Sequence, residues 1–292
     1  MISVIGDSIL DTYVYGKVER ISPEAPVPIL LKNKETHNLG GAAYVASIIA
    51  ANGHQVELFS NVFDDLSGRK IINLCTELNI PHKIHIEQNM VGKTPHKTRF
   101  IASNHQICRV DNETRLPNFN VDITPSLSTG ICIISDYGKG TLTSLPEIMK
   151  TLQADDFLVL VDPKHDDILF YDHSYIVTPN YKEFLQFLLK ADIEIADDTI
   201  ESIAQAALLL ILKTNIENII ITLSERGCLL ITSLGAVEYF KGSPVEVCDV
   251  TGAGDTFVAF LAMALNNKVP LKEGVISTLK FGNRVSLSTR HI

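Results

Sequence analysis

Tryptophan is absent from this chain of 292 residues, and cysteine and methionine are scarce, with five and four copies. The cysteines are scattered and form no C-x-x-C pair, so the usual spacing of a zinc site or a redox pair is excluded. We therefore predict buried thiols in a protein of the reducing cytoplasm. The five positions are Cys75, Cys108, Cys132, Cys228 and Cys248.

A long apolar run, a leader segment and an excess of positive charge are also missing. The longest apolar run, residues 203–212, is about half of the roughly 20 residues that cross a bilayer, and the chain opens on a strand-like Ile2–Ile5. Neither a membrane span nor a secretory signal is predicted. The formal charge of −9 argues against a nucleic-acid partner.

The remaining composition, 46% hydrophobic, predicts one large domain over residues 1–292. Short β-branched runs alternate with longer helical periods, such as the one over residues 198–213. This alternation predicts an α/β fold with a mainly parallel sheet and helices on both faces, in which ligands gather at the carboxyl ends of the strands. Strands are predicted at residues 131–134, 157–161, 175–177 and 219–222.

Two stretches lack a helix between their strands. Residues 12–34 are rich in valine, tyrosine and isoleucine and are interrupted by prolines, and residues 97–111 have the pattern of a second hairpin. We expect them to form a small antiparallel sheet, a lid that stands off the body. Its edges and apolar face need a cover, either the body or a second copy of the chain.

The most informative stretch is the glycine-rich segment 249–256, which precedes residues at helical spacing. Gly252, Ala253 and Gly254 leave the first amides of that helix open to an anion, and Asp255 in its first turn is placed to accept a proton from an attacking hydroxyl. The alternative is an ordinary helix start, in which Asp255 only complements the helix dipole. Gly92-Lys93-Thr94 is not a P-loop, because Glu87 stands where that motif requires glycine.

Three further features have both a functional and a structural interpretation. Gly40-Gly41, before a predicted helix at 42–51, admits either a small polar ligand or close packing of the helix. Asp7 and Asp11 follow the first strand, where carboxylates bind sugar hydroxyls, although Asp7 can equally cap the backbone. Asn180 and Glu183 are placed either to order water around Mg²⁺ or to cap a helix.

Residues 249–256 resemble the C-terminal signature of the ribokinase, or PfkB, family of carbohydrate kinases, and Gly40-Gly41 falls at that family's N-terminal glycine pair. Further segments resemble the bacterial D-glycero-β-D-manno-heptose-7-phosphate kinases of this family. They are GDSILD at 6–11, ISPEAPVP at 21–28, SDYGKG at 135–140, DPK at 162–164 and TPN at 178–180. The resemblance runs from about residue 3 to the last helix and implies a ribokinase-like fold with a β-sheet lid.

The resemblance also implies roles for individual residues. Asp255 is the expected catalytic base, and the amides of Gly252, Ala253 and Gly254 the expected anion hole. The expected sugar-phosphate ligands are Asp11, Gly40, Gly41, Tyr44, Lys97, Arg99, Arg109 and Asp136. The expected nucleotide-binding residues are Asn180, Glu183, Ser224, Gly227 and Asn283, with Glu183 reaching Mg²⁺ through water. For Lys97, Arg99 and Arg109 the alternative is a solvated sheet face.

By this resemblance, the expected reaction is ATP- and Mg²⁺-dependent phosphorylation of the anomeric hydroxyl of a heptose 7-phosphate. The product is the 1,7-bisphosphate on the route to ADP-heptose and the lipopolysaccharide core, and the enzyme is expected to pair through its lids. Tyr44 replaces the usual asparagine of the heptose kinases, which keeps open another sugar or sugar phosphate. A catalytically idle binding protein is the remaining alternative. The end at Ile292 predicts that any later adenylyl transfer belongs to another protein.

Overall fold

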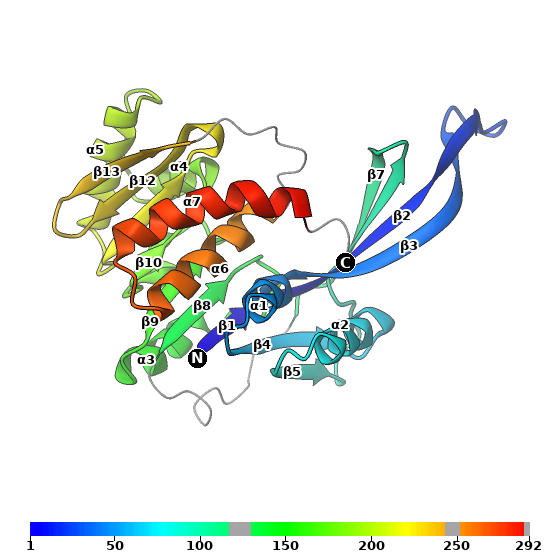
Figure 1. Ribbon diagram of the computed structural model, residues 1–292, viewed down its shortest axis with the longest axis horizontal. Coiled ribbons are helices and arrows are strands. Elements are labelled where there is room, and N and C mark those ends of the chain that lie inside the picture. Colours follow the sequence, from blue (N-terminus) through cyan, green and yellow to red (C-terminus); the bar gives the residue numbers. More distant parts are fainter. Residues whose placement is uncertain (117–129, 243–251, 289–292) are drawn as a thin grey trace.

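The computed structural model describes residues 1–116, 130–242 and 252–288, with residues 281–288 as backbone only. A nine-stranded sheet in the order β13-β12-β11-β10-β9-β8-β1-β4-β5 forms the centre of the body (Figure 1). Neighbouring strands are parallel except at β11–β12 and β12–β13. Its strands are β1 (Ile2–Gly6), β4 (Val56–Phe63), β5 (His82–Glu87), β8 (Ile131–Ser135), β9 (Leu158–Asp162), β10 (Ile176–Val177), β11 (Asn218–Thr222), β12 (Gly227–Thr232) and β13 (Val237–Lys241).

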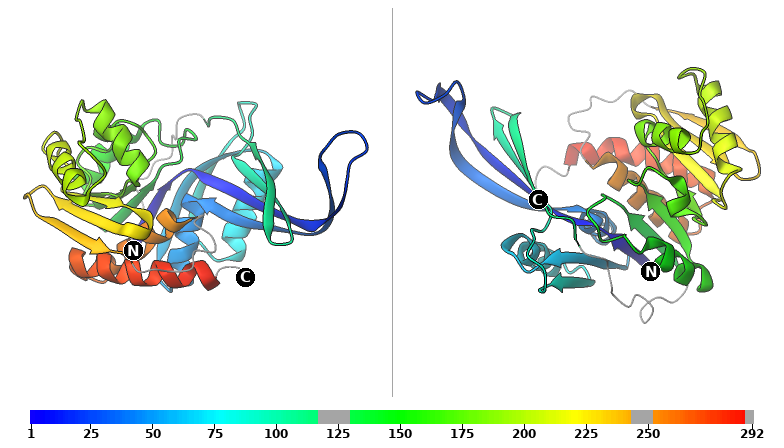
Figure 2. Two further views of the ribbon diagram at one scale, coloured as in Figure 1. Left: turned by 90° about the horizontal axis from the view of Figure 1, so that it is seen from above. Right: turned by 180° about the vertical axis from the view of Figure 1, so that it is seen from behind.

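Helices cover both faces of this sheet, as Figures 1 and 2 show from opposite sides. One face packs on α1 (Ala42–Ala51), α2 (Leu66–Glu77), α6 (Ala253–Asn266) and α7 (Leu271–Ser288). The other packs on α3 (Leu145–Ala154), α4 (Tyr181–Lys190) and α5 (Ile200–Ile211). Short 3₁₀ turns, η1 (Ile168–Tyr171) and η2 (Ser224–Arg226), follow two of the strands.

The central strands are apolar throughout because each contributes to two cores. In β1, Val4 points to the core beneath α1 and α6, whereas Ile5 points to the core beneath α3 and α4. Ile133 and Ile134 of β8 alternate in the same way, as side chains of an extended chain must. The predicted fold class, a mainly parallel sheet flanked by helices, is confirmed.

A separate four-stranded sheet, in the order β3-β2-β6-β7, forms the lid. Its strands are β2 (Ser8–Ile21), β3 (Pro28–Gly41), β6 (His96–Ala102) and β7 (His105–Asn112). The β2–β3 arm extends well beyond the body (Figures 1 and 2). The prediction of an antiparallel sheet is wrong in one respect, since β2 and β6 pair in parallel. The reason is that the first strand of each hairpin leaves the body in the same direction.

The two faces of the lid have different partners. On one face, the hydroxyl of Thr12 lies 2.8 Å from a ring nitrogen of both His37 and His96, and His96 in turn contacts Ser67 of α2 at 3.1 Å. This network ties the base of the lid to the body. The opposite face carries Asp11 and Lys97, which are direct cross-strand neighbours, and it is the face that takes part in the candidate site.

The lid also exposes apolar side chains, which are Val18, Ile21, Val27, Leu31, Ile107 and Val110. Such side chains are what a second copy of the chain would cover, and pairing through the lid stays a prediction. Cys108 on β7 is likewise exposed, so its predicted burial is wrong, because the whole of this edge strand faces outward. Cys75, Cys132 and Cys228 are buried as predicted, and Cys248 lies outside the described residues.

Candidate active site

Polar residues gather where four adjacent strands end. Asp7 follows β1, Asp136 follows β8, Asp162 ends β9 and Asn180 follows β10, and these strands are neighbours in the sheet. Carboxyl ends of parallel strands lie at one edge, so the four side chains reach the same side of the body. This edge is also where the lid begins, since β2 starts directly after Asp7.

The first turn of α6 faces this edge with open amides. Gly252 is the N-cap residue, no side chain caps the helix among the described residues, and Ala253 and Gly254 are exposed. Gly252 has a φ of 78°, and a Cβ there would lie 2.8 Å from Cε1 of Tyr44. The position therefore requires glycine on two counts, backbone conformation and the Tyr44 ring beside it. The open amides and the helix dipole suit an anion.

Asp255 lies in that first turn and is buried, with 4% of its surface exposed. Its Oδ2 accepts a hydrogen bond of 2.8 Å from the hydroxyl of Tyr137, whereas Oδ1 has no hydrogen-bond partner among the described residues. Burial, opposed by the hydrogen bond from Tyr137, together with the carboxylate of Asp11, opposed by the ammonium of Lys97, raises the pKa of Asp255 to about 6. This pKa favours the ionised carboxylate at neutral pH, and the buried Oδ1 retains a hydrogen-bonding capacity that no described residue uses.

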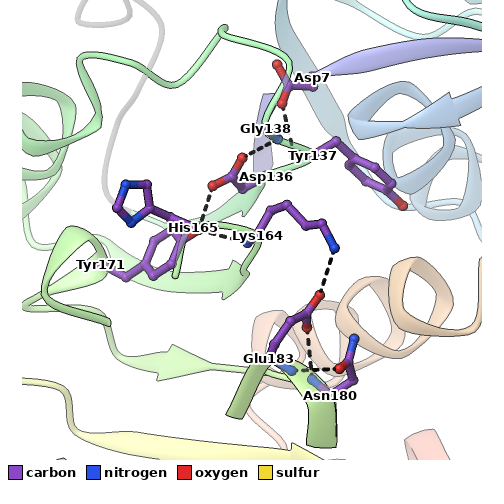
Figure 3. Close-up of polar contacts among 9 residues, drawn as sticks. All are labelled: Asp7, Asp136, Tyr137, Gly138, Lys164, His165, Tyr171, Asn180 and Glu183. Carbon is purple, nitrogen blue, oxygen red and sulfur yellow. Dashed lines mark hydrogen bonds and ion pairs between the residues drawn. The ribbon is translucent and has the colours of Figure 1, made fainter. Parts of the chain in front are cut away.

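Asp7 organises the loop that carries Tyr137 (Figure 3). Its carboxylate accepts the backbone N–H groups of Tyr137, Lys139 and Thr141 at 3.0, 2.9 and 3.0 Å. Asp7 is fully buried, and this burial raises its pKa. Of the two interpretations drawn from the sequence, the structure favours backbone capping over sugar binding.

Asp136, expected to bind substrate, already has partners within the protein. Its two oxygens accept hydrogen bonds from the Tyr171 hydroxyl at 2.5 Å and the Gly138 backbone N–H at 2.7 Å (Figure 3). The same hydroxyl of Tyr171 accepts the backbone N–H of Lys164 and His165. Asp136 therefore joins the loop after β8 to the loop after β9, which is a structural use of its carboxylate.

On the lid side, Arg99 is buried and its guanidinium forms an ion pair with Asp11. The guanidinium also lies 5.2 Å from the centre of the Tyr13 ring. Gly40 lies against the same carboxylate, since a Cβ there would be 2.5 Å from Oδ2 of Asp11, and a Cβ at Gly41 would be 2.2 Å from the carbonyl oxygen of Asp7. Both glycines thus have a packing reason, although the close contacts are with residues 7–11 and not with the following helix.

Lys97 and Arg109 differ, although both were expected to meet the substrate phosphate. Lys97 is half-buried, its ammonium lies 5.3 Å from the centre of the Tyr137 ring, and burial lowers its pKa. Arg109 is exposed and pairs with Asp111 of its own strand at 2.8 Å. The solvated-face alternative therefore describes Arg109, and neither Lys97 nor Arg99.

The expected nucleotide side is built around α4. Asn180 and Glu183 form a complete capping box, and Oε1 of Glu183 lies 3.5 Å from the ammonium of Lys164 (Figure 3). These side chains line a cavity of about 450 Å³ together with Asp136. Ser224 and Gly227 bound the short η2 turn, and Asn283 lies on α7 among the residues described as backbone only.

The site also contains residues for which no role was predicted from the sequence. Tyr137, Asp162 and Lys164 lie within the SDYGKG and DPK segments, and both segments begin where a central strand ends. Their position at a strand end was the signal that could have identified them. Their hydrogen-bond partners could not be predicted in this way; Tyr137 and its partner Asp255, for example, are 118 residues apart in the chain.

The sequence matches the family model described as pfkB family carbohydrate kinase over residues 1–289. The chain belongs to this family. It is 38% identical over 285 residues to the bifunctional protein HldE of Paramagnetospirillum magneticum, covering 94% of this chain and 57% of that protein. It is 38% identical over 283 residues to HldE of Helicobacter pylori strain G27, covering 93% and 59%. The chain thus spans less than two-thirds of these relatives.

Solved structures of other sugar kinases share the fold. Phosphofructokinase-2 from Escherichia coli superposes with a TM-score of 0.77 at 18% identity, covering 98% of this chain and 93% of that one. Ribokinase from Arabidopsis thaliana, complexed with ribose and ATP, gives a TM-score of 0.74 at 17% identity, with 97% and 91% covered. The ribokinase-like fold expected of a PfkB protein is therefore confirmed.

Among the helices in the described ranges, none has the length and apolar character of a bilayer span.

Proposed function

We propose that this PfkB protein is an ATP-dependent sugar kinase in which Asp255 is the general base. The observation that carries the proposal is the buried carboxylate of Asp255, with Oδ1 unpartnered among the described residues, beside the exposed first turn of α6. A carboxylate in that position accepts a proton, and the adjacent amides of Ala253 and Gly254 suit the phosphoryl oxygens. The catalytically idle alternative has no comparable support.

The proposed step transfers the γ-phosphoryl group of ATP to a sugar hydroxyl. A P–O bond forms to the sugar oxygen, the bond to the bridging oxygen of ATP breaks, and ADP leaves with that electron pair. The hydroxyl proton passes to Oδ1 of Asp255. In a loose transition state this proton moves late, so a carboxylate of pKa about 6 suffices.

The carboxylates at this edge fit a magnesium ion that arrives with ATP. Burial first, and then the charges of Asp255, Glu183 and Asp136, raise the pKa of Asp162, while the nearby Lys164 opposes them only in part, so a further cation would be stabilised here. Mg²⁺ usually keeps several waters and phosphate oxygens as ligands, so it needs few ligands from the protein. Asp162 and Glu183 would hold the ion, which would neutralise charge on the phosphates.

For the acceptor, we propose the anomeric hydroxyl of D-glycero-β-D-manno-heptose 7-phosphate. The GDSILD, ISPEAPVP and SDYGKG segments support this substrate, as do the relatives named HldE at 38% identity. A sugar that carries a phosphate also needs a cation at the lid. Lys97, half-buried beside Tyr137 and near Asp11, supplies one.

Substitution Lys97→Met is expected to raise the KM for the sugar phosphate about 10- to 100-fold, since it removes a charge-assisted contact with the phosphate. The KM for ATP should stay the same. Arg109→Ala is the matched control, because this exposed arginine is paired within β7 and should leave both constants near normal. Steady-state kinetics of both variants test the assignment. If Lys97→Met raised the KM equally for a sugar that carries no phosphate, the assignment would be contradicted.

Tyr44 supports a second candidate, a PfkB kinase for a different phosphorylated sugar. The ring of Tyr44 lies against Gly252. At the position of Tyr44, the heptose kinases usually have asparagine. A panel of heptose 7-phosphate, dephosphorylated heptose, fructose 6-phosphate and ribose, assayed for ADP release with ATP and Mg²⁺, separates the two. We expect turnover of heptose 7-phosphate with the new phosphate at the anomeric carbon by ³¹P NMR. Turnover of another sugar alone would favour the second candidate, and none at all would reject the kinase assignment.

A further inference from the structure

Tyr137 is held in the site before any substrate is present. Its backbone N–H donates to Asp7, and the neighbouring N–H groups of Lys139 and Thr141 donate to the same carboxylate. Asp136, the preceding residue, is fixed by Tyr171 and by the N–H of Gly138. The loop is therefore anchored at its start by two buried carboxylates. These contacts hold in place the backbone from which the ring of Tyr137 projects.

The hydroxyl of Tyr137 is a donor that does not lose its proton at ordinary pH. Burial, the charge of Asp255 and the charge of Asp162 all raise the pKa of Tyr137 above its usual 10. The ammonium of Lys97 lies 5.3 Å from the centre of the ring, at a distance where a cation and an aromatic ring attract each other. The side chain of Tyr137 thus lies between Lys97 of the lid and the carboxylate of Asp255.

The hydrogen bond from this phenol makes the two oxygens of Asp255 different in their contacts. Oδ2 accepts the Tyr137 hydroxyl at 2.8 Å, and the buried Oδ1 has no partner among the described residues. A donor of this kind stabilises the ionised carboxylate and fixes its orientation. It also leaves a single oxygen for the proton of the acceptor hydroxyl.

We propose that Tyr137 is a positioning residue for phosphoryl transfer, holding Oδ2 of Asp255 so that Oδ1 receives the proton from the sugar. The inference rests on the proposed kinase function. Tyr137 itself transfers no proton and forms no bond to the substrate. Its contribution is to keep the base ionised and oriented.

The first test compares Tyr137→Phe with the wild type across pH. The other groups that face Asp255 are Asp11 on β2, Lys97 on β6 and Asp162 at the end of β9, and all of them are kept in the variant. Loss of the donor should move the acid limb of the kcat/KM profile to higher pH by about one to two units. It should lower kcat more than it raises the KM for ATP.

Tyr175→Phe is the matched control, since Tyr175 is half-buried at the amino end of β10, away from the strand ends of the site. Its profile should coincide with that of the wild type. An acid limb in Tyr137→Phe that also coincides with the wild type would overturn the proposal. Tyr137→Leu, which lacks the hydroxyl as well, replaces the phenylalanine variant if that variant fails to fold.

A second measurement does not depend on turnover. With ¹³C-labelled aspartate, the carboxyl signal of Asp255 is assigned by its loss in Asp255→Asn and is then titrated in the wild type and in Tyr137→Phe. A rise in its pKa in the variant supports the proposal, and an unchanged titration refutes it. If no sugar is phosphorylated, the kinase function fails, but this titration still decides whether Tyr137 controls Asp255.

Discussion

Replacing Asp255 by asparagine is expected to lower kcat by about 10²–10⁴-fold, the usual contribution of a general base. The amide cannot accept the proton that Oδ1 takes, whereas the shape of the side chain is retained. ATP binding should persist, because the first-turn amides are unaltered. In the wild type, activity should fall as the pH drops below about 6, since burial raises the pKa of Asp255 to that value and only the ionised form accepts a proton. A coupled assay of ADP release against pH measures both effects.

The same substitution should leave the fold intact. Asp255 is buried and its Oδ1 has no partner within the described residues, so removing the charge should keep or raise the melting temperature. Asp192→Asn is the control, because Asp192 is exposed after α4 and its φ of 55° is one that asparagine tolerates. Near-normal turnover of folded Asp255→Asn would reject Asp255 as the base.

Replacing Asp7 by alanine is expected to reduce the free energy of unfolding by about 3 kcal/mol or more. The variant leaves the N–H groups of Tyr137, Lys139 and Thr141 without their acceptor, and each buried unsatisfied group costs about 1–3 kcal/mol. The raised pKa of Asp7 shows that burying this carboxylate is itself costly, which offsets part of the loss. Urea denaturation followed by circular dichroism measures the change.

Asp7→Asn should fall between alanine and the wild type, because one carbonyl oxygen replaces two acceptors. Asp64→Ala serves as the surface control, since Asp64 pairs with Arg69 where both side chains are solvent-accessible, and such pairs contribute about 0–1 kcal/mol. If Asp7→Ala and Asp64→Ala lowered the stability equally, the three hydrogen bonds at Asp7 would have no special weight. Activity of Asp7→Ala should also fall, because the loop it holds carries Tyr137.

The architecture was largely predictable from periodicity. Runs such as 131–134 and 219–221 are apolar at every position, a pattern that a strand has when helices cover both faces of the sheet, and both lie in interior strands of the sheet. The lid hairpins were also predictable from their prolines and β-branched residues. Their parallel pairing was not, because the pairing of β2 with β6 joins segments that are far apart in sequence.

For the site, local sequence determined the helix start at Gly252, the position of Asp255 in its first turn and the strand ends that carry Asp7, Asp136 and Asn180. These features depend on residues a few positions apart, where spacing and conformational preference act directly. Only the tertiary structure decided which carboxylates are already used. It paired Asp7 with backbone N–H groups and Asp11 with Arg99, and among the described residues it gave the side chain of Asp255 one donor, the hydroxyl of Tyr137. The physical reason is that hydrogen bonds and burial depend on distances across the sheet and lid, which no local pattern contains.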